Sequence, residues 1–201
     1  MVKRSIALVL LALWASCTTP PPIQATSSFA ASPALVLRNP ADIAVLPVED
    51  GSPGSAAARY VDYMRQALWR QLPERLYSPL SLELVDAAML RHQKQAGETV
   101  MTPAYLKRIA GKSSEEAALA VRVNRWDESH MMTDKKVDFD VQAAMVASDG
   151  EILWSGSLAG SVKAGGLAAA PRDRDQMGRS CAEQAMAEVL NHLQRRRAGS
   201  H

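Results

Sequence analysis

The sequence predicts an α/β (α+β) domain built on a mixed sheet of about five strands. A strand–helix–strand pattern opens the domain near residue 43, and three segments of alternating polarity follow between residues 117 and 162. A long amphipathic helix then ends the chain. A strand followed by a crossover helix pairs in parallel, whereas strands joined by short links pair antiparallel, so one sheet contains both kinds of pairing. Residues 41–197 are enough for one domain with its own hydrophobic core.

The strand–helix–strand unit is expected between residues 43 and 84. The apolar run 43–48 is typical of a strand buried on both faces. Ser55 is expected to cap a helix that Pro73 ends, and the alternation of leucines with polar residues in 80–84 predicts a second strand, parallel to the first. The apolar face of the helix comprises Tyr60, Met64, Ala67, Leu68 and Leu72.

Two short helices are expected next. Asp86 can cap a helix over residues 87–95 that ends near Gly97. The pair Thr102-Pro103 is a clear helix start, because a hydroxyl side chain caps the first turn and proline fits its first position. This second helix is expected to end by Gly111.

The rest of the domain predicts an antiparallel three-strand meander and a C-terminal helix. The strands are expected at 117–126, 137–146 and 151–162, and Asp149-Gly150 is a strong hairpin turn signal between the last two. Each strand alternates apolar and polar residues, so each is expected to bury one face. The apolar stripe of the final helix comprises Met177, Cys181, Ala185, Val189 and Leu193.

The N-terminus predicts export. Two basic residues precede the uncharged apolar run 6–14, which suits the hydrophobic region of a signal peptide; a membrane-spanning helix needs about 20 such residues. Small residues and then Cys17 follow, which resembles the lipobox of bacterial lipoproteins. That resemblance implies a signal peptide over 1–16 and a lipid attached to Cys17. Trp14 stands where the family usually has Leu, and an ordinary signal peptide cleaved after Ala25 is the alternative.

Residues 17–40 are expected to form a lipidated Pro/Ser/Thr-rich tether, because such a composition buries too little apolar surface to offset the entropy of ordering. As a flexible coil this stretch would span about 25–30 Å. Within it, the run 34–37 could either pair as an edge strand or simply pack on the domain. Residues 198–201 are expected to fray.

Composition excludes several classes of function. The net charge is +2, and the predicted signal peptide holds two basic residues and no acidic one, so the mature chain is balanced and is not expected to bind nucleic acid. With Cys17 acylated, Cys181 has no disulfide partner and is expected to be a small hydrophobic residue of the core. We find no catalytic constellation and no cofactor site, and we expect neither an enzyme nor a small-molecule substrate.

Two side-chain groups could still carry chemistry. The segment His130-Met131-Met132 could supply soft copper ligands, but a site needs further ligands that cannot be placed, so the segment is interpreted as a hairpin tip between two strands. Asp138 and Asp140 point the same way on one strand, where paired carboxylates normally belong to a solvated face. We therefore predict no metal site and no acid/base pair.

Three motifs resemble lipoproteins with a TolB-N/CsgG/LpoB-like α/β domain. The segment 44–50 resembles their opening strand, 116–123 their middle strand, and 148–156 their hairpin. The size and layout resemble the neisserial-type surface lipoproteins of this group. The resemblance implies a non-enzymatic lipoprotein anchored in the outer membrane. In enterobacterial lipoproteins an Asp directly after the lipidated Cys retains the protein at the inner membrane, and this chain has Thr18 at that position. Its periplasmic domain would bind envelope partner proteins or copies of itself. A subunit of an oligomeric export apparatus of the CsgG type is the alternative.

Overall fold

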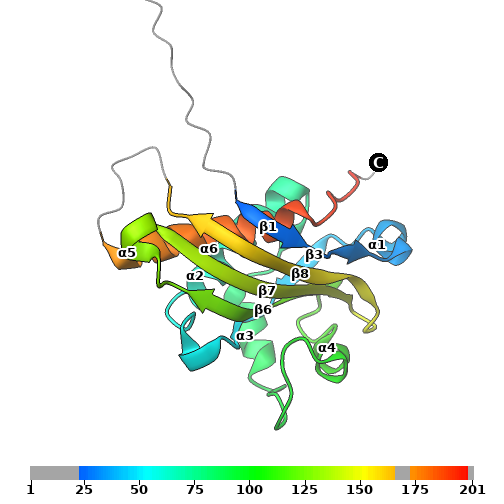
Figure 1. Ribbon diagram of the computed structural model, residues 1–201. Coiled ribbons are helices and arrows are strands. Elements are labelled where there is room, and N and C mark those ends of the chain that lie inside the picture. Colours follow the sequence, from blue (N-terminus) through cyan, green and yellow to red (C-terminus); the bar gives the residue numbers. More distant parts are fainter. Residues whose placement is uncertain (1–22, 166–172, 199–201) are drawn as a thin grey trace, which may run out of the picture.

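The computed structural model describes residues 23–165 and 173–198, and its centre is one mixed sheet of eight strands (Figure 1). The predicted class is confirmed, with more strands than expected. In order across the sheet, the main strands are β1 (Gln24–Ser27), β8 (Ile152–Lys163), β7 (Lys136–Ala147), β6 (Ala117–Asp127), β3 (Asp42–Val45) and β5 (Ser78–Pro79). Two further short strands pair beside this path, β2 (Ala30–Ala31) with β8 and β4 (Glu49–Asp50) with β6.

The antiparallel meander forms where the sequence predicts it. Strand β7 pairs with β6 on one side and β8 on the other, so that Val141 lies opposite both Val123 and Leu158. All three residues are buried, as the alternating pattern requires. Gly150 closes the β7–β8 hairpin with a φ of +91°, a conformation that glycine adopts without a steric cost.

The parallel part of the sheet is smaller than predicted. Strand β3 pairs in parallel with β6, while only Ser78–Pro79 pairs with β3 on its other side. The predicted strand over 80–84 is wrong, because these residues lead into helix α3 (Leu82–Met89). Ser81 caps this helix through a hydrogen bond that its Oγ accepts from the Leu84 amide. Leu84 is exposed, so the alternating leucines do not form a buried strand face. Leu82, Val85 and Met89 are instead spaced as one face of a helix and pack against the core.

Two predicted helix starts also shift. Asp86 caps no helix over 87–95; it lies inside α3 and forms an ion pair with Arg65, the Nη1–Oδ1 distance being 2.6 Å. Ser55 has a φ of +54°, which a helix cannot continue, so helix α2 (Val61–Gln71) begins six residues later. The apolar face predicted for α2 is nevertheless confirmed, since all five of its residues are buried. Helix α4 (Pro103–Ile109) begins after Thr102 as predicted, but the Thr102 hydroxyl does not cap it and instead accepts a hydrogen bond from the Thr99 amide at 2.9 Å.

Most of the predicted tether is folded, which corrects the expectation for residues 24–38. Strand β1 pairs antiparallel with β8, and Ser32 caps helix α1 (Pro33–Arg38), so the run 34–37 is helical. The Phe29 ring stacks on Trp154 at 4.5 Å between centroids, over the backbone of Gly156, where a Cβ would overlap it. The composition of this segment suggested that it buries too little apolar surface to offset the entropy of ordering. The Phe29–Trp154 contact and the buried Leu35 side chain provide that surface.

Helices cover the two faces of the sheet unequally. Helices α2 and α6 (Arg174–Asn191) pack on one face along the meander, where they enclose the larger core (Figure 1). All five residues of the stripe predicted for α6 are buried. Helices α3 and α4 enclose a smaller core on the other face, over parts of β3, β6 and β7. None of the helices in residues 23–165 and 173–198 has the length and hydropathy to span a membrane.

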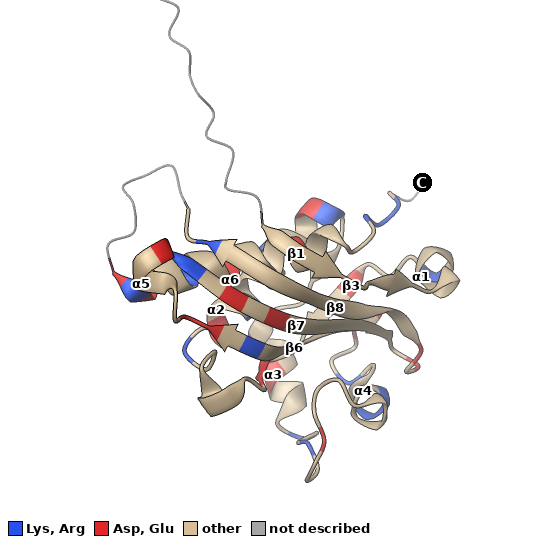
Figure 2. Cartoon of the chain, in the orientation of Figure 1, with Lys and Arg blue, Asp and Glu red and all other residues tan. Residues whose placement is uncertain are grey.

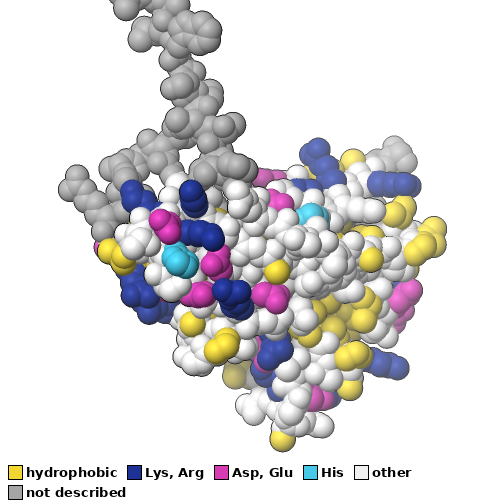
Figure 3. Space-filling model, in the orientation of Figure 1, with side chains coloured by type: hydrophobic (Ala, Val, Ile, Leu, Met, Phe, Trp, Pro, Cys, Tyr) yellow, Lys and Arg dark blue, Asp and Glu magenta, His cyan; other side chains and the backbone are white. Residues whose placement is uncertain are grey.

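The remainder of the second face has no helix over it among the described residues, and we call it the open face. It is formed by β1, β8, β7 and the end of β6, which lie side by side in Figure 2. Charged side chains gather over its end near the one-turn helix α5 (Met131–Asp134), and its middle is largely uncharged (Figure 3). Its outward residues include Thr26, Arg125, Asp138, Asp140, Gln142, Ser157, Ala159 and Ser161.

Substituting Gly178 by alanine should destabilise the domain. A Cβ at this position of α6 would overlap the ring and hydroxyl of Tyr60, which is fully buried. Alanine would otherwise stabilise a helix interior by up to about 1 kcal/mol, whereas overpacking costs about 1–3 kcal/mol. We expect a net loss of about 1–2 kcal/mol in urea unfolding. The penalty should shrink in a Tyr60→Leu background, and an unchanged midpoint for Gly178→Ala would contradict this packing.

Candidate functional site

The predicted lipid attachment site, Cys17, lies outside the described residues and stays a prediction. The described part of the chain begins at Ile23, six positions later. A chain of six residues reaches at most about 20 Å, against about 75 Å for the fully extended stretch up to Pro40. A lipid on Cys17 would therefore hold the domain closer to the membrane than a tether over 17–40 predicts.

The His130-Met131-Met132 segment does not converge on a common point. His130 is exposed and its Nδ1 lies 3.6 Å from the Asp134 carboxylate, while Met131 is fully buried in the core and Met132 points to solvent. The segment is the loop between β6 and β7, tightened by α5. In the described part of the chain, no three His, Cys, Asp or Glu side chains are grouped to hold a metal ion.

The other singled-out side chains have structural environments. Cys181 is buried as predicted, and desolvation raises the pKa of its thiol to about 12, so it is neutral and unreactive at neutral pH. Asp138 pairs with Lys136 at 2.9 Å, and Asp140 lies 3.5 Å from the Asn124 amide. Each carboxylate thus has its own partner on the open face, as expected for a solvated surface.

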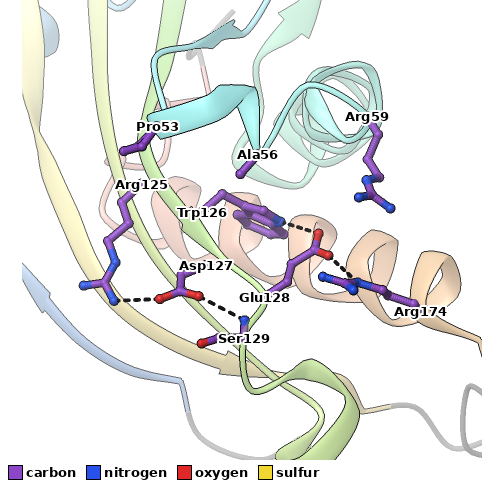
Figure 4. Close-up of a pocket in the computed structure, with 9 residues that line it drawn as sticks. All are labelled: Pro53, Ala56, Arg59, Arg125, Trp126, Asp127, Glu128, Ser129 and Arg174. Atoms are coloured by element: carbon purple, nitrogen blue, oxygen red, sulfur yellow. Dashed lines mark hydrogen bonds and ion pairs between the residues drawn. The ribbon is translucent and has the colours of Figure 1, made fainter.

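A hollow that sequence reasoning missed lies at the junction of three elements. It has a volume of about 470 Å³ and lies between the turn before α2, the end of β6 and the first turn of α6 (Figure 4). Its lining combines a small apolar surface with several charged groups. The lining residues are Pro53, Ala56, Arg59, Arg125, Trp126, Asp127, Glu128, Ser129 and Arg174.

A buried carboxylate organises one side of this hollow. The Glu128 side chain is only 6% exposed. Its Oε1 accepts a hydrogen bond from the Trp126 indole at 3.1 Å, and its Oε2 accepts one from Arg174 Nε at 2.7 Å (Figure 4). Tyr60 packs against the Trp126 ring at 5.5 Å, and burial together with the Glu128 carboxylate raises the pKa of its hydroxyl. The tyrosine therefore stays neutral.

The second charged group lies on the other side of the hollow. Asp127 accepts a hydrogen bond from the Ser129 amide and another from Arg125 Nη2, at 2.9 and 3.2 Å. The hydrogen bonds from Ser129, with that from Arg125 after them, lower the pKa of Asp127 to about 2. The carboxylate is thus ionised at any physiological pH and is already neutralised by its own arginine.

The chemistry available in the hollow is recognition of an anion. Three arginines face two carboxylates, which leaves one positive charge in excess. Each of its two carboxylates is held by one arginine and by a further hydrogen bond, Glu128 from the Trp126 indole and Asp127 from the Ser129 amide. Sequence reasoning could not detect this arrangement, because Arg174 is 46 positions away from Glu128.

Glu128→Gln should destabilise the domain by about 1–3 kcal/mol, the range of a hydrogen bond to a charged group, because it removes the negative charge facing Arg174. Urea unfolding at pH 7 measures the effect. Glu183→Gln is a matched control, since Glu183 forms an exposed pair with Arg70 at 3.0 Å and should contribute less than about 1 kcal/mol. Equal losses in the two variants would contradict an organising role for Glu128.

Comparison with known proteins supports the fold. No protein-family model matches the chain, and no curated protein matches it. The PelC dodecamer from Paraburkholderia phytofirmans is 14% identical over 87% of this chain and 100% of that chain, with a TM-score of 0.51. Lipoprotein GNA1162 from Neisseria meningitidis is 23% identical over 77% and 98% of the two chains, with a TM-score of 0.46. LpoB from Escherichia coli is 17% identical over 81% and 82%, with a TM-score of 0.42. The chain thus shares its fold with PelC.

Proposed function

We propose that this chain is a lipid-anchored lipoprotein of the bacterial cell envelope whose domain binds partner proteins and catalyses no reaction. The lipid would be attached at Cys17, and the domain would face the periplasm from the outer membrane. The sequence supports this through its signal-peptide pattern, its lipobox and the charge balance of the mature chain. The GNA1162 structure is itself that of a lipoprotein.

The proposal that the domain binds partner proteins rests on the open face. A sheet normally buries both faces or leaves one to solvent, and here helices cover one face fully and the other only in part. The open face ends at β1, an edge strand of four exposed residues that contains no charge and no proline. Natural edge strands usually carry such features when pairing must be prevented. A partner could therefore add to this edge and rest on the neighbouring open face.

A second candidate function is a subunit of an oligomeric apparatus. PelC from Paraburkholderia phytofirmans, which shares the fold, forms a dodecamer. In this case the partner on the open face would be another copy of the same chain. The two candidates differ in what contacts the open face, and one experiment separates them.

Cys17→Ala should release the protein from the membrane. A multiply acylated cysteine gains about 0.8 kcal/mol per buried methylene, so the wild-type chain should remain in the membrane fraction. The variant should appear in the soluble fraction and lose the label from radioactive palmitate. Cys181→Ala is the control and should change neither result, because Cys181 is buried in the core. A Cys17→Ala variant that still fractionates with membranes would contradict the anchor.

A photoreactive amino acid at Ala159 should form crosslinks in intact cells. Ala159 is exposed in the middle of the open face, beside Thr26 of the edge strand. The same probe at Glu183, on the exposed side of α6, is the control and should give fewer adducts. Mass spectrometry then identifies the adduct as another protein, which supports the first candidate, or as a second copy, which supports the second. Equal crosslinking from both positions would contradict a role for the open face.

A further inference from the structure

The hollow beside Glu128 contains guanidinium groups whose charge is not satisfied by the described residues. Arg174 uses only its Nε to bind Glu128, and neither of its terminal nitrogens has a hydrogen bond or ion pair in the described structure. Arg59 makes no ion pair with any described carboxylate, and its nearest charge-related contact is the Tyr60 ring at 5.5 Å. Figure 4 shows the heads of both arginines on the side of the Glu128 carboxylate that is turned away from Trp126.

Arg174 is positioned by a buried carboxylate. Glu128 is buried, so it fixes Arg174 Nε in one direction, and the Trp126 indole fixes the other carboxylate oxygen. Trp126 is in turn packed against Tyr60, which fills the space left by Gly178 of α6. Arg125 belongs to the separate pair with Asp127, and Asp175 is paired with Arg179. None of these carboxylates is available to Arg59 or to the outer nitrogens of Arg174.

The shape and the charge of the hollow select a class of ligand. A guanidinium offers parallel N–H donors that match the two oxygens of a carboxylate, and such charge-assisted pairs are stronger than neutral ones. Pro53, Ala56 and Trp126 add an apolar surface beside the arginines. A volume of about 470 Å³ is within the usual range for a small ligand.

We propose that this hollow binds the C-terminal end of a peptide, with its free carboxylate between Arg59 and Arg174 and its last, small apolar side chain against Trp126. The choice of a peptide rests on the proposed partner-binding function, whereas the carboxylate recognition rests on the arginines alone. Capture of a terminal carboxylate is an established mode of peptide recognition. The hollow would then be a specificity pocket that adjoins the open face at Arg125.

The test is an NMR titration of the full chain in detergent micelles, labelled with ¹⁵N at tryptophan. The probes are N-acetyl-alanyl-alanine, its C-terminal amide, and inorganic phosphate. We expect the free-carboxylate peptide to shift the Trp126 indole signal saturably. The indoles of Trp69 and Trp154 are internal references, because they donate to the carbonyls of Leu80 and His192 away from the hollow. The amide should produce no saturable shift.

Arg59→Gln should weaken binding of the peptide about tenfold or more, as expected for the loss of a hydrogen bond to a charged group. Arg70→Gln on α2 is the matched control, because it removes the same charge from an exposed pair outside the hollow. Neither substitution removes the buried Glu128 carboxylate. Unchanged Trp69 and Trp154 signals in both variants verify that the fold is intact. Identical shifts from acid and amide, equal affinity for phosphate, or an Arg59→Gln variant that binds like wild type would each overturn the proposal. Crosslinking from Ala159 probes the open face separately, so failure of one experiment does not decide the other.

Discussion

The pairing of β7 on both sides is the constraint on which the rest of the fold depends. Its partners extend along nearly its whole length, from Lys136 opposite Lys163 to Ala147 opposite Ala117. Because side chains alternate along a strand, this double register fixes which residues of β6 and β8 face α2 and α6 and which face outward. A slip of one residue would turn Phe139 and Val141 out of the core. The open face and the position of Trp126 both follow from this register.

Two glycines allow close contacts between distant segments of the chain. Gly178 lets the Tyr60 ring lie directly on α6, and Gly156 lets Phe29 stack over Trp154. Each contact joins segments that are distant in the sequence. The first supports the wall of the hollow, and the second attaches the N-terminal segment to the sheet. Small residues at these positions therefore have a packing role that their own helix or strand does not reveal.

Local patterns predicted the meander and the apolar faces of α2 and α6 well, because the alternation in β6, β7 and β8 and the helical stripes are decided by residues close in sequence. The strand predicted over 80–84 was wrong because the leucines there fit both strand alternation and helical spacing. Ser81 caps the helix and so favours the helical structure. The segment 24–31 failed because its composition is that of a coil, while its order comes from Phe29 meeting Trp154. The hollow could not be predicted, since Arg59, Glu128 and Arg174 meet only in three dimensions.

Strand β1 has a mechanical consequence because of its place at the edge of the sheet. A pull on the chain ahead of Ile23 reaches the domain through the four paired residues of β1 before any helix is strained. If the pull is along the strand, all of the β1–β8 hydrogen bonds resist together in shear. If it is across the strand, they open one after another from Gln24. The direction of force at the N-terminus therefore determines whether this strand detaches from β8 easily or resists as a unit.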